Sequence, residues 1–513
     1  MSVDCLLIYP FLEEANWKNE LRSKDNLALG YLASCAREAG FTVKIVHAEH
    51  LKYDADDIVR IVCECQPKAI GISCTAQRAY PIAKKYAYKI KEKTSVPIFM
   101  GGVFPTIAYE AIFNDCDCFD AISLGEGEIF IVEYLNHIIK DAPKDTIKGI
   151  VYKDEKGSLI VNPQTNIIDL DTLPLPAKDF FDDMKEELEN GFYYINISAS
   201  RGCYANCSFC SLKHLTSAIK KRTRNPRKVV EEIKYFQNKY NVTYFKFVDE
   251  QFIDIFHPEW VIEFCDEMKK QDVHVKFHIE ARVDSIKENL IKPLKDVGLD
   301  EVFIGLESGD IGILKRYRKG HNPKQAEEAV KLLRKYNINV QYGYIMIDAG
   351  MTFDQLKNNI SWILKLGGYS KHNLYNKLNL YYGTDLYKEN IQNANDDMPF
   401  YSRDFHGFVD QKVERFSSLI DIAKKTVTEY NTNVNSYLLK LIKNKNTANK
   451  WKSIAADINS FEVIIWESII LKALLFVESF DEFELDIWHT YLQEQVHILS
   501  RNLKSVQEGE LAC

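Results

Sequence analysis

The sequence predicts an α/β protein with three parts: a doubly wound parallel sheet, a partial (β/α)6 barrel and a C-terminal helical domain. Short apolar strands alternate with amphipathic helices from the start of the chain, the alternation restarts near residue 192, and the last part has a helical pattern. At 513 residues, the chain is too long for a single hydrophobic core. The expected parts are a first domain at 1–140, a linker at 141–190, a barrel at 191–390 and a helical domain at 391–513.

The first domain is expected to contain five buried strands in a parallel sheet. The apolar runs lie at 3–9, 41–46, 69–73, 97–100 and 121–124, and the helices at 27–39, 55–65 and 79–92. Such sheets bind ligands beyond the carboxyl ends of their strands. Gly101-Gly102 and Gly125-Glu126-Gly127 follow two of these strands, and glycine lets a large flat ligand approach the backbone closely.

The barrel follows an acidic, proline-containing segment at 169–176, which is typical of an extended bridge between domains. Its strands are expected at 192–198, 243–249, 275–282, 301–306, 339–347 and 375–381, and its helices near 226–240, 258–271, 287–297, 323–336 and 352–366. Prolines stand where three of these helices would begin. The chemistry of such a barrel gathers at the carboxyl ends of its strands.

The expected strand at 275–282 has one apolar face and one polar face. The polar face carries Lys276, His278, Glu280 and Arg282. In an ordinary half-exposed strand this face would meet solvent. In a barrel it points inward, where charges need partners or a ligand. Arg282 and Glu280 lie nearest the expected catalytic end.

Three cysteines, Cys203, Cys207 and Cys210, stand close together in the spacing C-x3-C-x2-C. Thiolates select zinc, copper(I) or iron–sulfur clusters. Iron–sulfur clusters usually take four cysteines, so a [4Fe–4S] cluster on these three would leave one iron open to a small molecule. The alternatives are a zinc knuckle with His214 as the fourth ligand, or three unligated core cysteines.

The cysteine spacing, with Phe209 before the last cysteine, resembles the radical S-adenosylmethionine (SAM) superfamily. The resemblance implies that SAM binds the open iron of a [4Fe–4S] cluster and is cleaved to a 5′-deoxyadenosyl radical. It also implies that Asp249 or Glu250 binds the SAM amino group, although the glycines usual in that motif are missing. The residues assigned to SAM are Phe209, Asp249, Glu250, Glu280, Arg282, Glu307 and Ser308.

The first domain resembles the cobalamin-binding domain that is fused to many radical SAM enzymes. The resemblance rests on residues 27–33, 71–73, 101–106 and 125–128, and it implies a Rossmann-like fold. No histidine occurs before His47, which implies cobalt without a histidine ligand from this domain. The alternative is a domain that has lost the cofactor. The residues expected to contact cobalamin are Gly71, Ser73, Gly101, Gly102, Val103, Gly125, Glu126 and Gly127.

Together the two resemblances imply a class B radical SAM methyltransferase. One SAM molecule would methylate cobalamin, and a second would give the radical that abstracts hydrogen from an unactivated substrate carbon, which then takes the methyl group. The alternatives are a cobalamin-dependent rearrangement, ring contraction or cyclisation, a cobalamin-free enzyme such as a peptide epimerase, and a non-catalytic metal scaffold. No side chain is singled out as catalytic.

The composition of the chain indicates which classes of partner to expect. The charge balance is mildly acidic, at −8, and the basic residues are dispersed, so no nucleic-acid surface is expected. The one compact basic run, at 220–224, is interpreted as a solvated face that could attract an anionic substrate or an electron donor. No membrane span or signal peptide is expected, and twelve cysteines favour a reducing, cytoplasmic setting. The expected partners are a small-molecule or peptide substrate and a reductant such as flavodoxin or ferredoxin.

Overall fold

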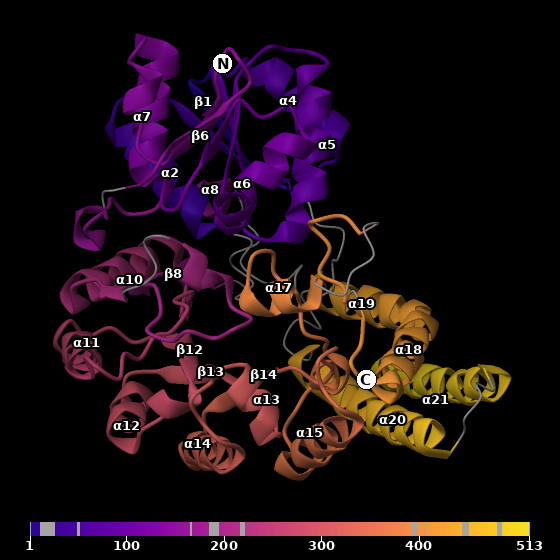
Figure 1. Cartoon of the computed structure of the whole chain (residues 1–513). Helices are drawn as coiled ribbons and strands as arrows, with labels where there is room; N and C mark the ends of the chain where they lie inside the picture. Colours follow the sequence, from indigo (N-terminus) through magenta and orange to yellow (C-terminus); the bar gives the residue numbers. More distant parts are fainter. Residues whose placement is uncertain are drawn as a thin grey trace.

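A computed structural model shows an N-terminal domain above a barrel, with the C-terminal helices beside the barrel (Figure 1). The structure describes residues 2–10, 26–48, 52–164, 167–183, 194–215, 221–391, 398–405, 407–443, 451–479 and 485–511.

The N-terminal domain is a seven-stranded sheet in the order β2-β1-β3-β4-β5-β6-β7, and its first five strands are parallel as predicted. These strands are β1 (Cys5–Tyr9), β2 (Val43–His47), β3 (Ala69–Ser73), β4 (Ile98–Gly101) and β5 (Ala121–Ser123). Helices α2 and α7 cover one face, and α4, α5 and α6 cover the other (Figure 1). Their bounds are Leu27–Glu38, Gly127–Lys140, Ala55–Cys65, Tyr80–Lys91 and Val103–Asp115. Apolar runs suit strands buried on both faces.

The segment at 141–190 is not only a linker, because it adds two antiparallel strands to the sheet. β6 (Ile150–Lys153) pairs with β5, and β7 (Leu159–Asn162) pairs with β6. The turn between them is closed by hydrogen bonds to Asp154, whose carboxylate accepts from the backbone of Lys156 and Ser158. An aspartate that bonds the backbone two residues on is a common turn device.

The barrel sheet is parallel, in the order β14-β13-β12-β11-β8. Its strands are β8 (Ile195–Ile197), β11 (Tyr244–Phe247), β12 (Lys276–Arg282), β13 (Leu299–Glu307) and β14 (Asn339–Tyr344), and a two-stranded ladder of β9 (Ser200–Arg201) and β10 (Arg222–Thr223) stands at its top. The outer helices are α10 (Pro226–Tyr240), α11 (Glu259–Lys270), α12 (Glu288–Asp296), α13 (Ile311–Arg316), α14 (Pro323–Lys335) and α15 (Phe353–Leu366). Asn225 and Asn322 cap α10 and α14, each with proline at the helix start.

The sixth expected strand, at 375–381, is not regular. Helix α16 (Lys371–Tyr375) includes the first residue of the expected strand, and only one parallel bridge, between Ile347 and Lys377, falls in the described part of this range. The Asn373 side chain donates to the Tyr342 carbonyl at 2.8 Å, so a side chain supplies a hydrogen bond to the end of β14. The barrel is therefore five strands and one extended segment.

The C-terminal part is helical, as predicted: α17 (Asp385–Ile391), α18 (Gln411–Thr426), α19 (Thr428–Lys443), α20 (Trp451–Ser479) and α21 (Leu485–Leu511). Buried residues of α18, α20 and α21 belong to the same hydrophobic core as the barrel. A buried ion pair of Lys371 and Glu462, 2.7 Å apart, also joins the two parts. None of the helices described combines the length and apolarity that crossing a bilayer requires.

Gln77, at the start of a short 3-10 turn after β3, joins the N-terminal domain to two distant segments. Its fully buried amide nitrogen donates to the carbonyls of Leu380, Tyr401 and Ser402, at 3.1, 3.2 and 2.7 Å. Its amide oxygen accepts from the Tyr382 backbone at 2.9 Å. One side chain therefore fastens three parts of the chain.

Candidate functional site

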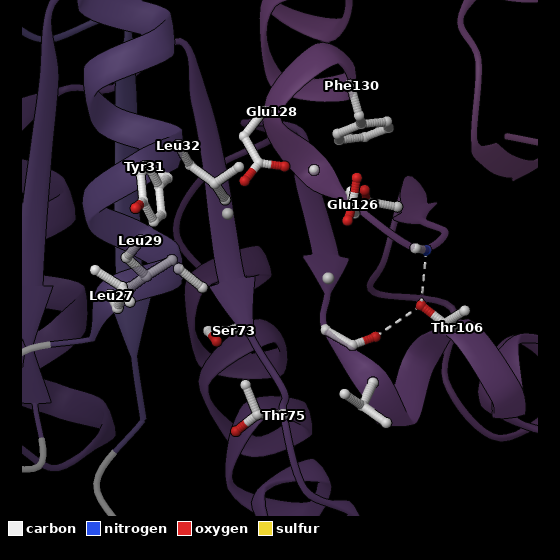
Figure 2. A pocket seen from close by; sticks show the side chains of 18 of the residues that line it. Leu27, Leu29, Tyr31, Leu32, Ser73, Thr75, Thr106, Glu126, Glu128 and Phe130 are labelled. Carbon is white, nitrogen blue, oxygen red and sulfur yellow. Dashed lines mark hydrogen bonds between the residues drawn. The ribbon is translucent and has the colours of Figure 1, made fainter. Parts of the chain in front are cut away.

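A cavity of about 310 Å³ lies between the carboxyl edge of the N-terminal sheet and the top of the barrel. All eight residues expected to contact cobalamin line it: Gly71, Ser73, Gly101, Gly102, Val103, Gly125, Glu126 and Gly127. Figure 2 shows the side chains of α2, the sheet edge and the start of α7 around this space. The barrel contributes Ser198, Ser200, Arg201, Leu215, Val248 and Glu250.

Two adjacent glycines at the end of β4 have different roles. A Cβ on Gly102 would lie 2.6 Å from the Cys74 carbonyl oxygen, and its φ of +121° disfavours other residues. A Cβ on Gly101 would meet only Ser123, at 3.5 Å. Gly102 is therefore required by the fold, whereas Gly101 leaves room in the cavity.

Thr106, which ends the stretch 101–106 but was given no role of its own in the sequence analysis, joins two of the glycine turns. Its hydroxyl donates to the Gly102 carbonyl at 2.8 Å and accepts from the Gly125 backbone at 3.0 Å (Figure 2). The two turns therefore form one rigid edge. Its place in the stretch 101–106 was a signal in the sequence, but the hydrogen bond to the second turn depends on tertiary packing.

The chemistry of the cavity fits a large, mostly apolar ligand with polar edges. Its walls include Leu29 and Leu32 of α2 and Phe130 of α7, and they are apolar over most of their area. Among the described residues, the buried hydroxyl of Ser123 has no hydrogen-bond partner, although it lines the cavity. A buried polar atom normally has a partner, so this hydroxyl can bond a ligand. No histidine is among the described lining residues.

Arginines from the barrel side cross to the N-terminal domain. Arg201 lies 2.5 Å from Glu128 and 3.4 Å from Glu126, and its guanidinium packs 5.4 Å from the Tyr31 ring centre. Arg222, the ladder partner of Arg201, also pairs with Glu126. The Glu126 carboxylate is therefore engaged by arginines, and its backbone N–H and carbonyl are both bonded to the Gln164 side chain, at 3.0 and 2.7 Å.

The interpretation of the basic run 220–224 as a solvated face is wrong for its described residues. Arg222 pairs with Glu126, and the nearly buried Arg224 pairs with Glu232 at 2.6 Å. Lys221 donates to the Gln251 and Phe252 carbonyls, the latter at 2.8 Å. Lys220 lies outside the described residues.

Asp249 and Glu250, at the end of β11, point to different places. Asp249 is buried and accepts from the Ala199 backbone at 3.1 Å and from the Ser200 hydroxyl, and burial raises its pKa to about 6. Glu250 lines the cavity and accepts from the Gly202 backbone at 3.1 Å. Burial raises its pKa as well. Of the two, Glu250 is the carboxylate that faces the cavity.

The three cysteines lie close together in the loop after β9. Burial raises the pKa of Cys203, and it raises that of Cys210 to about 11. In both cases the charge on a neighbouring cysteine of the triad raises the pKa further. The thiols are near enough for their charges to interact, although among the described residues no three His, Cys, Asp or Glu side chains stand in the arrangement of a single-ion site. A shared cluster would bind them as thiolates, because ligation removes their protons. The side chain of His214 lies outside the described residues.

Arg282 clamps the cysteine loop. Its guanidinium donates to Cys207 Sγ at 3.4 Å, to Asp284 at 3.1 Å and to the Lys319 carbonyl. Glu280 lies one step lower on the same face of β12, 3.9 Å from Lys246 and about one third exposed. Most donors of Arg282 are therefore committed to the protein.

Glu307 and Ser308, at the end of β13, also differ. Ser308 is fully buried, donates to Asn359 at 2.9 Å and accepts from the Asp310 backbone, so its hydroxyl holds the strand end. Glu307 has a φ of +61° and pairs with Lys319 at 3.0 Å. The Glu307 side chain is thus held beside the cysteine loop.

The segment after α13 supports the cysteine loop and was missed in the sequence. The Ser208 backbone and hydroxyl donate to the carbonyls of Tyr317 and Arg316, at 3.1 and 2.7 Å. Phe209 packs edge-on against Tyr317, with ring centres 5.4 Å apart. Phe209 therefore packs against Tyr317, whose backbone carbonyl also holds the cysteine loop.

The barrel interior is polar, as strand parity predicted. One register layer runs through all five strands and consists of Asn196, Lys246, His278, Glu301 and Asn339. His278 Nδ1 lies 3.1 Å from Glu301, and its buried Nε2 has no hydrogen-bond partner among the described residues. Lys276, at the start of the same face of β12, is exposed and pairs with Asp300, so only this end of the face meets solvent.

Comparison with known families matches residues 25–135 to the B12 binding domain and residues 197–363 to the Radical SAM superfamily. An uncharacterised methyltransferase of Pyrococcus horikoshii is 29% identical over 70% of this chain and 78% of its own length. The 4′-phospho-dehydrooxetanocin synthase of Priestia megaterium is 26% identical over 69% of this chain and about half, 51%, of its own length.

Two solved structures share the fold. The cobalamin-dependent SAM radical enzyme OxsB, with aqua-cobalamin and SAM bound, matches with a TM-score of 0.76 and 21% identity over 99% of this chain and 81% of its own. The radical SAM methyltransferase TsrM of Kitasatospora setae, with cobalamin and a [4Fe–4S] cluster bound, matches with a TM-score of 0.59 and 17% identity. The match covers 76% of this chain and 75% of TsrM. This chain belongs to the radical SAM enzymes that carry a cobalamin-binding domain, and its cofactors are a [4Fe–4S] cluster, SAM and cobalamin.

Proposed function

We propose that this chain is a cobalamin-dependent radical SAM C-methyltransferase acting on an unactivated carbon of a small molecule or peptide. The observation that carries the proposal is the cavity lined from both domains. The glycine edge of the sheet stands opposite Glu250, next to the cysteine loop, so a ligand on that edge faces the barrel top. A methyl donor and a hydrogen-abstracting group need this common space.

The residues divide the work. Cys203, Cys207 and Cys210 hold the cluster, and Glu250 rather than Asp249 receives the SAM amino group. Glu307 contacts SAM from the end of β13. When bound, the cofactors supply a transferable methyl group and a carbon-centred radical. The protein positions them, and the apolar walls from α2 and α7 exclude water.

The barrel interior is proposed to receive the substrate. Its register layer offers hydrogen-bonding groups of both kinds, and Lys246, Glu280 and Glu301 are each partly exposed. A ring of apolar side chains would fill an ordinary barrel. A polar substrate with donors and acceptors fits this interior, with flavodoxin or ferredoxin supplying electrons.

The deciding experiment measures products after anaerobic reconstitution with iron, sulfide, cobalamin and SAM. Candidate acceptors and a reductant are added, and mass spectrometry follows the three products. Methyl transfer predicts S-adenosylhomocysteine, 5′-deoxyadenosine and methylated product in equal amounts. The test variant is Cys207→Ala, which should abolish formation of 5′-deoxyadenosine, and its matched control is another cysteine. Cys63→Ala, an exposed cysteine of the N-terminal domain, should leave it unchanged.

A second candidate is a cobalamin-dependent rearrangement or cyclisation. It is favoured by similarity to a synthase and to an anaerobic magnesium-protoporphyrin IX monomethyl ester cyclase of Synechocystis, 26% identical over 59% of this chain and 60% of its own length. This reaction would form 5′-deoxyadenosine with no matching S-adenosylhomocysteine, so the same assay separates the two.

A further inference from the structure

His278 is a buried histidine in the barrel with one ring nitrogen unused. It stands near the middle of β12, and its side chain is only 6% exposed. Its Nδ1 lies 3.1 Å from a carboxylate oxygen of Glu301 on the neighbouring strand β13. Its Nε2 is buried and has no hydrogen-bond partner in the part of the chain that the structure describes. Buried polar atoms are normally paired, so this nitrogen is available to a ligand.

Glu301 sets the hydrogen-bonding character of its two neighbours. One of its carboxylate oxygens bonds Nδ1 of His278, and the other accepts from Nε2 of Gln341 on β14, at 2.5 Å. A carboxylate only accepts, so the neutral imidazole carries its hydrogen on Nδ1 and its Nε2 is an acceptor. Because the amide nitrogen of Gln341 is held by Glu301, its amide oxygen is also left as an acceptor. Both neighbours therefore offer acceptors to a ligand.

The layer above His278 leads toward the cavity between the domains. It contains Glu280, Phe303 and Gln341, which lie in register on β12, β13 and β14. The Glu280 side chain is 36% exposed. Burial raises the pKa of Glu250, and the charge of Glu280 raises it further. Since Glu250 lines the cavity, the Glu280 carboxylate lies close to the place where the barrel meets it.

The inward-facing charges of these two layers favour a cation. Glu280 and Glu301 are carboxylates, and among the described residues of the two layers Lys246, 3.9 Å from Glu280, is the one cationic side chain. With His278 neutral, two carboxylates face one ammonium. An excess charge away from water is costly unless a ligand or partner balances it.

We propose that the His278–Glu301 pair binds an ammonium group of the substrate, so the methyl acceptor is a molecule with a primary amino group. The inference rests on the proposed function, because it assigns the substrate class of that reaction. The ammonium donates to Nε2 of His278 and balances the excess negative charge. Glu301 is a positioning residue that holds the imidazole ring. A hydroxyl would satisfy Nε2 but not the charge, and a carboxylate would satisfy neither.

The test uses the full chain reconstituted with iron, sulfide, cobalamin and SAM, without a reductant, and three probes of similar shape: benzylamine, benzyl alcohol and benzoate. Ligand-observed NMR measures their affinities for wild type, His278→Phe and the control His274→Phe. His274 lies just before β12, and its side chain is 85% exposed. We expect benzylamine to bind best, and to bind about 10-fold or more weakly to His278→Phe alone, as for a lost hydrogen bond to a charged group.

Glu301→Gln separates the charge from the hydrogen bond. The amide oxygen can still accept from Nδ1 of His278, but the negative charge is gone. Benzylamine should therefore lose more affinity than benzyl alcohol in this variant. A merely structural role of Glu301 would weaken both probes equally.

Equal affinity of benzylamine for wild type and His278→Phe would overturn the inference. So would a wild type that prefers benzyl alcohol or benzoate, or that binds none of the probes with its cofactors in place. If His278→Phe does not fold, Glu301→Gln decides, because the ratio of benzylamine to benzyl alcohol affinity must fall. The probes bind without turnover, so selective binding of benzylamine with no methylated product in the product assay would reject the proposed function and leave the ammonium site standing.

Discussion

Arg201 Nη2 lies 2.5 Å from Glu128 Oε1 across the boundary between the two domains. Glu128 stands in the first turn of α7, next to the glycine edge, and Arg201 stands two residues before Cys203. This pair, together with the pairs of Arg201 and Arg222 with Glu126, ties the cysteine loop to the glycine edge of the sheet. A change at this pair should affect both cofactor sites.

Replacing Arg201 with Met should weaken both cofactor sites and destabilise the fold. Removing one partner of a largely buried ion pair typically costs about 3 kcal/mol, and Glu128 is only 6% exposed. Cobalt per chain after reconstitution should fall, and the urea midpoint should drop. Arg227→Met, which removes an exposed pair with Glu231 on α10, should change neither measurement appreciably. Unchanged cobalt content in the Arg201 variant would contradict the coupling.

Replacing Arg282 with Met should reduce iron content rather than SAM affinity alone. The guanidinium positions Cys207 and anchors the backbone at Lys319, so its loss loosens the loop. Iron per chain and the charge-transfer absorbance of the cluster measure this. Retention of full iron with a selective loss of SAM affinity would show instead that Arg282 binds SAM directly.

The two glycines at the end of β4 should respond differently to a side chain. Gly101→Val projects into the cavity with only an ordinary contact to Ser123, so corrinoid binding should fall while the unfolding midpoint changes little. Gly102→Ala strains a φ of +121° and approaches Cys74 O, so it should destabilise the domain. Corrinoid absorbance and chemical denaturation are the measurements. Full corrinoid content in Gly101→Val would show that the ligand does not occupy this edge.

Asp249 should make stability depend on pH. Burial raises its pKa from 3.8 to about 6 in the folded protein, so the unfolded chain releases this proton at lower pH. Protonation of Asp249 therefore contributes about 3 kcal/mol to the free energy of unfolding below pH 4. This contribution is lost as the pH rises through about 6. Asp249→Asn should flatten that part of the profile. Urea midpoints at pH 5.0, 6.0 and 7.0 test it, and parallel profiles would refute it.

The sequence predicted the parallel strands and the cavity edge well, because apolar runs and glycines at strand ends are local signals. It also gave the cysteine loop by spacing alone. The β6–β7 hairpin was missed although its signal was present, since an Asp–Gly turn at 154–157 separates two apolar runs. The proline-containing segment at 169–176 led to the interpretation of the whole range 141–190 as a linker.

The remaining features could not be predicted, because they join distant residues. Arg201 and Glu128 are 73 positions apart, and nothing local pairs them. The support that residues 316–319 give to the cysteine loop likewise depends on how the end of β13 folds back. Asp249 and Glu250 are neighbours in sequence, and only tertiary packing separates the buried carboxylate from the one that faces the cavity.

The Gln77 amide has a consequence for how the holoenzyme is assembled. It bonds segments from residues 380–382 and 401–402 to the turn after β3, and each bond would have to break before the domains could separate. A bulky corrinoid therefore enters most easily before the hydrogen bonds of the Gln77 side chain have formed. We expect cobalamin supplied during synthesis to be incorporated far better than cobalamin added to the finished apoprotein, and Gln77→Ala to narrow that difference.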